Sequence, residues 1–133
     1  MTRRMFAIII CVMATVLYVD DEEPIRRVVG AWLTRKGHIV HTAADVATAR
    51  ELLSTHAMDG AFIDLWLGHE SGLELQDWID DNKPEFATRV VFVTGDAVAS
   101  DANERALQFL GRPVLGKPFD MNELEAWVLR WVS

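Results

Sequence analysis

Polar side chains that can do chemistry follow four short apolar runs of this sequence. They are Asp20 and Asp21 after residues 15–19, Asp64 after residues 60–63, Thr94 after residues 89–93, and Lys117 after residues 114–115. Apolar runs of this length, bounded by glycine or polar residues, are typical of strands buried on both faces. In an open α/β sheet the carboxyl ends of the strands are where ligands bind. We therefore expect these groups to meet at one edge of a sheet.

The chemistry that these side chains could perform together follows from their charges. Carboxylates brought together repel one another, and a divalent cation relieves the repulsion; an all-oxygen set favours magnesium over zinc. Lys117 can hold an anionic group beside Asp64, and Thr94 adds a hydroxyl donor. This combination suits phosphoryl transfer, in which a carboxylate can itself be the nucleophile and form an acyl phosphate.

Each of these features also has a simpler interpretation. The acidic run 20–23 could complement the N-terminus of a helix, residues 94–96 could form a turn, and Lys117 could lie in a loop. The occurrence of all of them at equivalent strand ends favours a shared site.

The segments between these strands predict the elements that position the site. Helices are expected from Pro24 to a C-cap at Gly37 and over residues 43–54, 73–81, 100–110 and 121–131, with a further strand over residues 38–42. Strands that alternate with helices five times predict an α/β fold, a parallel sheet with helices on both faces.

Composition limits the function classes. The 133 residues suit one domain, and 20 acidic against 13 basic residues (net charge −7) argue against a nucleic-acid surface. Cys11 is the single cysteine, so no intrachain disulfide can form. The four histidines show no metal-ligand spacing.

Residues 1–13 form a basic start and an apolar run that resembles a secretory signal. The run is short for a membrane span, which needs about 20 residues. We interpret residues 1–13 as a leader before a domain over residues 14–133; a membrane anchor is the less favoured alternative.

Several motifs together resemble the receiver domain of two-component response regulators. They are Val19-Asp20-Asp21-Glu22, Ile63-Asp64-Leu65, Ser71-Gly72-Leu73-Glu74-Leu75, Val93-Thr94-Gly95 and Gly116-Lys117-Pro118-Phe119. The resemblance covers about Thr15 to Ser133. It implies a flavodoxin-like, doubly wound five-stranded parallel sheet with strand order 2-1-3-4-5.

The resemblance also implies a role for each site residue. Asp64 would accept a phosphoryl group from a histidine kinase or a histidine phosphotransfer protein. Asp21, Asp64 and the backbone carbonyl of Trp66 would ligate magnesium (Mg2+), with Asp20 supporting the ion through water. Thr94 and Lys117 would bind phosphoryl oxygens, and the Lys117–Pro118 peptide would be cis.

The same resemblance implies a cytoplasmic signalling domain that phosphorylates and dephosphorylates itself, rather than an enzyme with a separate substrate. Its output would come from docking to another protein, with a homodimer as one form. Residues 111–119 resemble the receivers attached to hybrid histidine kinases more than those of transcription factors.

Departures from the family pattern affect the expected mechanism. Val114 stands where an aromatic switch residue is frequent, so we expect signalling through the loop after Thr94. Gly68 stands where proline is frequent, which predicts a looser loop. Trp66 and Asp96 flank the site and are expected to alter the lifetime of the phosphoryl group.

Three other kinds of protein share some of these features. An aspartate-nucleophile phosphatase of the haloacid dehalogenase type requires a second acidic residue two positions after its nucleophile. Counted from Asp64, that position in this chain is Trp66. A nucleotide-binding module needs a glycine-rich turn after its first strand, where this chain is acidic. A phosphorylation-independent interaction module is the remaining alternative, since it would share the fold.

Overall fold

The computed structural model describes residues 13–95 and 111–132. The main sheet has five parallel strands in the order β2-β1-β3-β6-β7. These strands are β1 (Thr15–Val19), β2 (Ile39–Ala43), β3 (Gly60–Asp64), β6 (Val90–Thr94) and β7 (Val114–Gly116). Counted along the sheet strands alone, this is the predicted order 2-1-3-4-5, and the prediction is confirmed.

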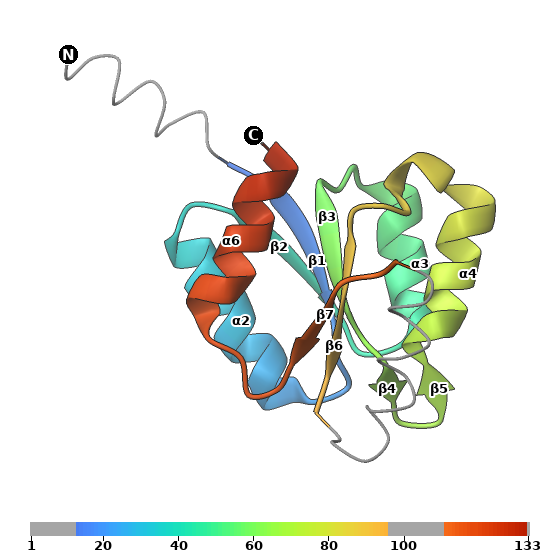
Figure 1. Cartoon of the computed structure of the whole chain (residues 1–133), viewed down its shortest axis with the longest axis horizontal. Helices are drawn as coiled ribbons and strands as arrows, with labels where there is room; N and C mark the ends of the chain where they lie inside the picture. Colours follow the sequence, from blue (N-terminus) through green and yellow to red (C-terminus); the bar gives the residue numbers. More distant parts are fainter. Residues whose placement is uncertain (1–12, 96–110, 133) are drawn as a thin grey trace.

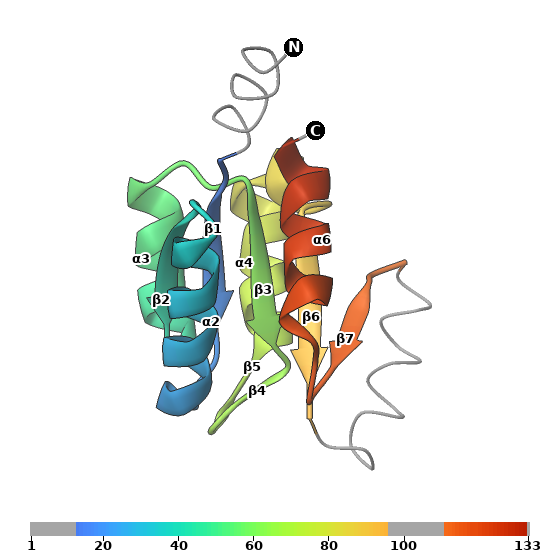
Figure 2. The same ribbon diagram turned by 90° about the vertical axis from the view of Figure 1, so that its left-hand side faces the viewer.

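Helices cover both faces of the sheet (Figures 1 and 2). They are α2 (Glu23–Arg35), α3 (Val46–Thr55), α4 (Gly72–Asn82) and α6 (Met121–Val132), with a short 3-10 turn, η1 (Pro84–Phe86). Helices α2 and α6 lie on one face, and α3 and α4 on the other. The helix expected over residues 100–110 lies outside the described residues.

The alternation of side chains along β1 divides the core into two clusters. Leu17 and Val19 face α3 and α4, whereas Val16 and Tyr18 face α2 and α6. Every residue of β3 is buried, which accounts for its unbroken apolar sequence before Asp64.

Local sequence signals explain most helix ends. Pro24 lies in the first turn of α2, and Gly37 follows the helix with a φ of 95°. The side chain of Asp45 accepts a hydrogen bond from the Thr48 N–H and caps α3. Asp120 and Glu123 form a capping box at the start of α6: Asp120 accepts the N–H of Asn122, and Glu123 accepts the N–H of Asp120.

Two details differ from the expectations. Helix α3 begins at Val46 rather than residue 43, because Ala43 continues β2 and pairs with Val19. Val28 continues the apolar spacing of Ile25 and Val29 in α2, which predicts burial, yet it is 55% exposed. It lies beside the site described below.

No helix in the described ranges has the length and apolar character needed to span a membrane. The predicted leader falls outside the described residues apart from Met13.

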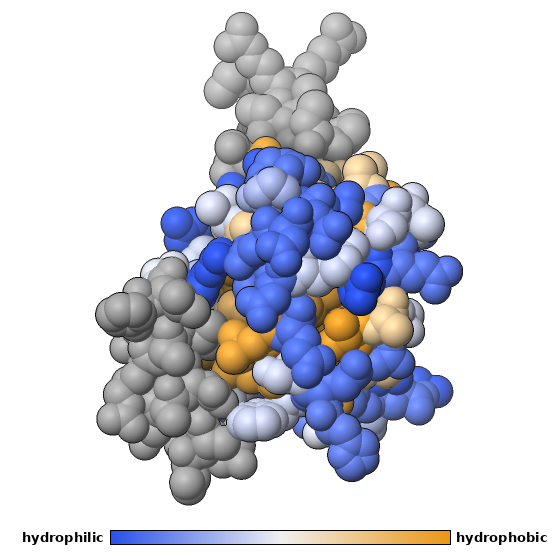
Figure 3. All heavy atoms as spheres, turned by 90° about the vertical axis from the view of Figure 1, so that its right-hand side faces the viewer, coloured by the Kyte–Doolittle hydropathy of each residue, from blue (hydrophilic) through white to orange (hydrophobic). Residues whose placement is uncertain are grey.

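Figure 3 shows the side of the molecule that carries α3 and α4, where hydrophilic residues cover most of the visible surface around a smaller apolar area. This distribution fits helices that bury one side against the sheet.

Candidate functional site

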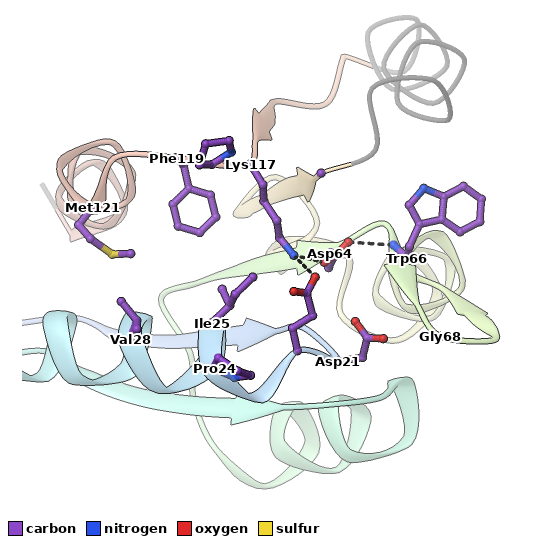
Figure 4. Close-up of a pocket in the computed structure, with 13 residues that line it drawn as sticks. Asp21, Pro24, Ile25, Val28, Asp64, Trp66, Gly68, Lys117, Phe119 and Met121 are labelled. Carbon is purple, nitrogen blue, oxygen red and sulfur yellow. Dashed lines mark hydrogen bonds and ion pairs between the residues drawn. The ribbon is translucent and has the colours of Figure 1, made fainter.

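The parallel sheet brings the predicted site residues to its carboxyl edge. Asp20, Asp64, Thr94 and Lys117 stand at or just beyond the ends of β1, β3, β6 and β7, four neighbouring strands. Figure 4 shows the side chain of Lys117 directed toward Asp64, with Asp21 on the opposite side of the same space. The convergence expected from sequence is therefore present.

Lys117 joins the carboxylates at the centre of the site. Its Nζ lies 2.6 Å from Oδ2 of Asp64 and 2.8 Å from Oδ2 of Asp20, and it is 3.3 Å from Oε1 of Glu22. Burial by itself lowers the pKa of Lys117, but the hydrogen bonds and charges of Asp20 and Asp64 outweigh it and raise the pKa. The ammonium group of Lys117 therefore stays protonated and positively charged.

Asp20 is fully buried and has a hydrogen-bond donor on each oxygen. Oδ1 accepts the N–H of Glu22 at 3.0 Å, and Oδ2 accepts the hydroxyl of Tyr18 at 2.9 Å in addition to Lys117. Arg26 donates to the main-chain carbonyl of Asp20 at 2.8 Å. Burial, and then the charge of Asp20, raise the pKa of Tyr18, so the phenol stays protonated and donates.

Asp64 is held from two sides. Its Oδ1 accepts the N–H of Trp66 at 2.9 Å, and its Oδ2 accepts Lys117. Burial raises the pKa of Asp64, although Lys117 and the Trp66 N–H oppose the rise. Helix α4 begins against this residue, since a Cβ at Gly72 would collide with the carbonyl oxygen of Asp64. Gly72 thus allows the close approach of the helix.

The donor set fits a magnesium ion. Ligand atoms of Asp20, Asp21, Glu22 and Asp64 all lie within 4.8 Å of one another, and all are oxygens. The buried hydroxyl of Thr94 has no hydrogen-bond partner among the described residues, so it is available to a ligand. The role of the Trp66 carbonyl stays a prediction.

The residues after Asp64 form a small antiparallel hairpin of β4 (Trp66–Leu67) and β5 (Glu70–Ser71). Gly68 takes a φ of 68°, which favours glycine, and so serves the turn. Oε1 of Glu70 accepts the N–H of Val46 at 3.2 Å and ties the hairpin to the start of α3. The segment that we expected to be a loop thus contains a short paired hairpin.

A pocket of about 890 Å³ opens beside these groups (Figure 4). One end is polar and contains Asp21, Asp64 and Lys117. The other end is apolar and is lined by Pro24, Ile25, Val28, Phe119 and Met121. The pocket thus places an apolar wall next to the acidic site, and the exposure of Val28 belongs to this wall.

Sequence reasoning missed two residues of the site. Glu22 was assigned only to an acidic run, and Tyr18 only to a buried strand, yet both contact the central network. A signal existed for Tyr18, because residues 18 and 20 of a strand lie on one face.

The Lys117–Pro118 peptide is cis, as the resemblance implied. Asp96 lies outside the described residues.

Comparison with known proteins places this geometry in a family. Residues 16–129 match the response regulator receiver domain. The transcriptional regulatory protein GltR of Pseudomonas aeruginosa is 30% identical over 114 residues, 84% of this chain and 46% of GltR. The response regulator protein PilR of the same species is 33% identical over 117 residues, 86% of this chain and 26% of PilR. The chain thus spans less than half the length of these two relatives.

Comparison with solved structures agrees with this family match. NtrX from Brucella abortus superposes with a TM-score of 0.74 at 31% identity, over 90% of this chain and 27% of NtrX. A CheY-like receiver domain protein from Methanospirillum hungatei superposes with a TM-score of 0.78 at 22% identity, over 90% of this chain and 94% of that one, which shows the shared fold. With its sheet order, its acidic cluster and its lysine, this chain belongs to the response regulator receiver domain family.

Proposed function

We propose that Asp64 accepts a phosphoryl group from a histidine kinase or a histidine phosphotransfer protein, and that the domain signals by docking to another protein. The observation that carries the proposal is the position of Lys117, whose Nζ contacts both Asp64 and Asp20 inside a cluster of four carboxylates. A cation in this position can bind the phosphoryl group next to the acceptor oxygen.

The chemical step is a transfer between two side chains. A carboxylate oxygen of Asp64 attacks the phosphorus atom of a phosphohistidine, and the phosphorus–nitrogen bond breaks as the oxygen–phosphorus bond forms. The electron pair of the broken bond stays on the imidazole, and Asp64 becomes an acyl phosphate. Hydrolysis returns the carboxylate and releases inorganic phosphate.

The remaining residues position and neutralise the transferred group. Lys117 contacts a phosphoryl oxygen, and Thr94 gives it the hydroxyl that has no partner among the described residues. Magnesium held by Asp21 and Asp64, with Asp20 beside them, would neutralise negative charge on the phosphoryl oxygens. The main-chain N–H of Trp66 orients the carboxylate of Asp64.

The pocket gives a partner room to approach. Its apolar wall, which includes Ile25, Val28 and Phe119, lies beside Asp64. Such a wall can accept an apolar surface around the histidine of the partner. The transcriptional role in the name of GltR belongs to that protein, which is more than twice as long as the matched part.

Intrinsic tryptophan fluorescence tests the proposal. We expect magnesium to quench the fluorescence, and beryllofluoride or a small acyl phosphate donor to change it further. Asp64→Asn should abolish the second change, whereas Asp81→Asn, on the exposed side of α4, should behave as the wild type. If the wild type shows no response and mass spectrometry finds no phosphoryl adduct, the domain is a phosphorylation-independent interaction module instead.

A further inference from the structure

Tyr18 reaches the site from inside the core. It is the single tyrosine of the chain, and it is fully buried in β1. Its ring packs against Phe62 with a centroid separation of 6.3 Å. Because residues 18 and 20 lie on one face of the strand, the phenol extends to Asp20, and its hydroxyl lies 2.9 Å from Oδ2.

The two donors to Oδ2 of Asp20 differ in how they are held. Lys117 is on a long side chain and is shared with Asp64, whereas Tyr18 is fixed by its buried ring. The main-chain N–H of Glu22 donates to the other oxygen, Oδ1, and the guanidinium of Arg26 donates to the main-chain carbonyl of Asp20. Among the described residues, the hydrogen bonds to Oδ2 therefore come from Tyr18 and Lys117 alone.

We propose that Tyr18 is a positioning residue of the phosphoryl-transfer site, whose hydroxyl holds Oδ2 of Asp20 so that Lys117 can leave Asp20 for the phosphoryl group. This inference rests on the proposed function of Asp64 and Lys117. It assigns a role in the reaction to a residue that packing alone does not require to be a tyrosine.

The physical reason is the burial of Asp20. When Nζ of Lys117 turns to a phosphoryl oxygen, Oδ2 of Asp20 loses a charged donor, although Asp20 has no exposed surface. A buried carboxylate oxygen without a donor is strongly unfavourable. The hydroxyl of Tyr18 stays on Oδ2 and reduces this loss. Without the hydroxyl, Asp20 retains Lys117 more strongly, and the phosphoryl group binds less well.

A packing role predicts something different. The ring of Tyr18 lies in an apolar cluster with Val16, Phe62 and Val91, where phenylalanine would fill the same space. Tyr18→Phe therefore removes the hydrogen bond and preserves the packing. A purely structural residue would weaken every ligand of the site in parallel, whereas the proposed role affects the ligand that must take Lys117 from Asp20.

The test is to measure magnesium and beryllofluoride binding to Tyr18→Phe by tryptophan fluorescence. We expect beryllofluoride at saturating magnesium to bind about tenfold more weakly, as for the loss of a hydrogen bond to a charged group. Magnesium affinity should not weaken, since Asp20 has lost a donor and kept its charge. Val16→Ala, which loosens the same cluster without contacting Asp20, should leave the ratio of the two affinities unchanged.

The double variant Asp20→Asn/Tyr18→Phe shows whether the effect passes through Asp20. In the Asp20→Asn background, Tyr18→Phe should no longer change beryllofluoride affinity, because residue 20 then has no charge to retain Lys117. Equal weakening of both ligands by Tyr18→Phe, or no change in either, would overturn the role of Tyr18. Failure of the wild type to bind either ligand would instead overturn the proposed function.

The single tyrosine also gives a direct spectroscopic readout. With tyrosine labelled at the ring carbon that bears the hydroxyl, carbon-13 NMR shows one signal, which belongs to Tyr18. We expect this signal to move in Asp20→Asn and to move on addition of beryllofluoride with magnesium, because Oδ2 then relies on the phenol. If the chemical shift of this signal does not change when beryllofluoride binds to the wild type, the inference is contradicted.

Discussion

Nζ of Lys117 lies 2.6 Å from Oδ2 of Asp64, although 53 residues separate the two in the chain. The contact exists because β3 and β7 both run parallel to β6, which lies between them, and end at the same edge of the sheet. This contact joins the buried carboxylate of Asp64 to the ammonium group that, in the proposed function, binds the phosphoryl group.

Lys117→Ala should destabilise the metal-free fold by about 3–5 kcal/mol, as when a buried ion pair loses one partner. The side chain of Lys117 is 11% exposed, and its loss leaves Asp20 and Asp64 close together without a compensating cation. Urea denaturation measures the change, and magnesium should restore more stability to the variant than to the wild type. Lys36→Ala, at an exposed lysine over the ring of Trp32, is the matched control. Equal losses for the two variants would contradict this account.

Asp64→Asn should stabilise the metal-free protein near pH 7. Burial raises the pKa of Asp64, so the folded state holds a proton on this carboxyl more tightly than the unfolded chain does. Ionisation of Asp64 therefore opposes folding above the folded pKa and has no such effect below the unfolded pKa, about 4. The advantage of the variant should shrink as the pH falls toward that value. Thermal unfolding at several pH values checks this; a variant less stable than the wild type near pH 7 would show that pairing with Lys117 outweighs burial.

Thr94→Val should separate stability from phosphoryl binding. The hydroxyl of Thr94 is buried without a partner among the described residues, so its removal should leave the free energy of unfolding unchanged or raise it by up to about 1–3 kcal/mol. The same variant should accept phosphoryl groups from an acyl phosphate donor more slowly, since it lacks the hydroxyl that we propose to stabilise the transferred group. Thr94→Ser keeps a hydroxyl and should retain most of the rate. Wild-type kinetics in Thr94→Val would remove this hydroxyl from the mechanism.

Trp66→Ala should shorten the lifetime of the acyl phosphate severalfold. The side chain of Trp66 is 45% exposed and lines the pocket that contains Asp64, and we expect its indole to limit the access of water to the acyl phosphate. The main-chain N–H that orients Asp64 is retained in the variant. Decay of a radioactive phosphoryl label measures the lifetime, and Trp32→Phe on α2 serves as the control. An unchanged half-life would show that the indole does not shield the site.

Gly72→Ala and Gly30→Ala should have opposite effects. A Cβ at Gly72 collides with the main chain of Asp64, so the substitution should destabilise the fold by about 1–3 kcal/mol and weaken magnesium binding. A Cβ at Gly30, inside α2, has only an ordinary contact with Thr42 at 3.9 Å. Gly30→Ala should therefore stabilise the helix by about 0.5–1 kcal/mol. Thermal unfolding compares the two, and a neutral Gly72→Ala would show that α4 can shift away from Asp64.

The sequence by itself determined that the sheet is parallel and at which edge the site lies, whereas the order of its strands followed from the resemblance to receiver domains. Buried strands have a local signature, and Asp20, Asp64, Thr94 and Lys117 follow four of them. Parallel strands must then bring those residues together. Helix ends marked by Pro24 and Asp120 were predictable for the same local reason.

Tertiary structure decided the details that depend on distant partners. The hairpin after Asp64 has strands of two residues, too short to carry a periodic pattern, and Glu70 reaches a helix start 24 positions away. Glu22 meets Lys117 across 95 positions. The bond from Tyr18 to Asp20 was within reach of sequence reasoning, but a buried tyrosine in a strand is ordinarily explained by packing. Only the packed sheet, which fixes the ring and leaves Asp20 without exposed surface, makes the hydroxyl a part of the site.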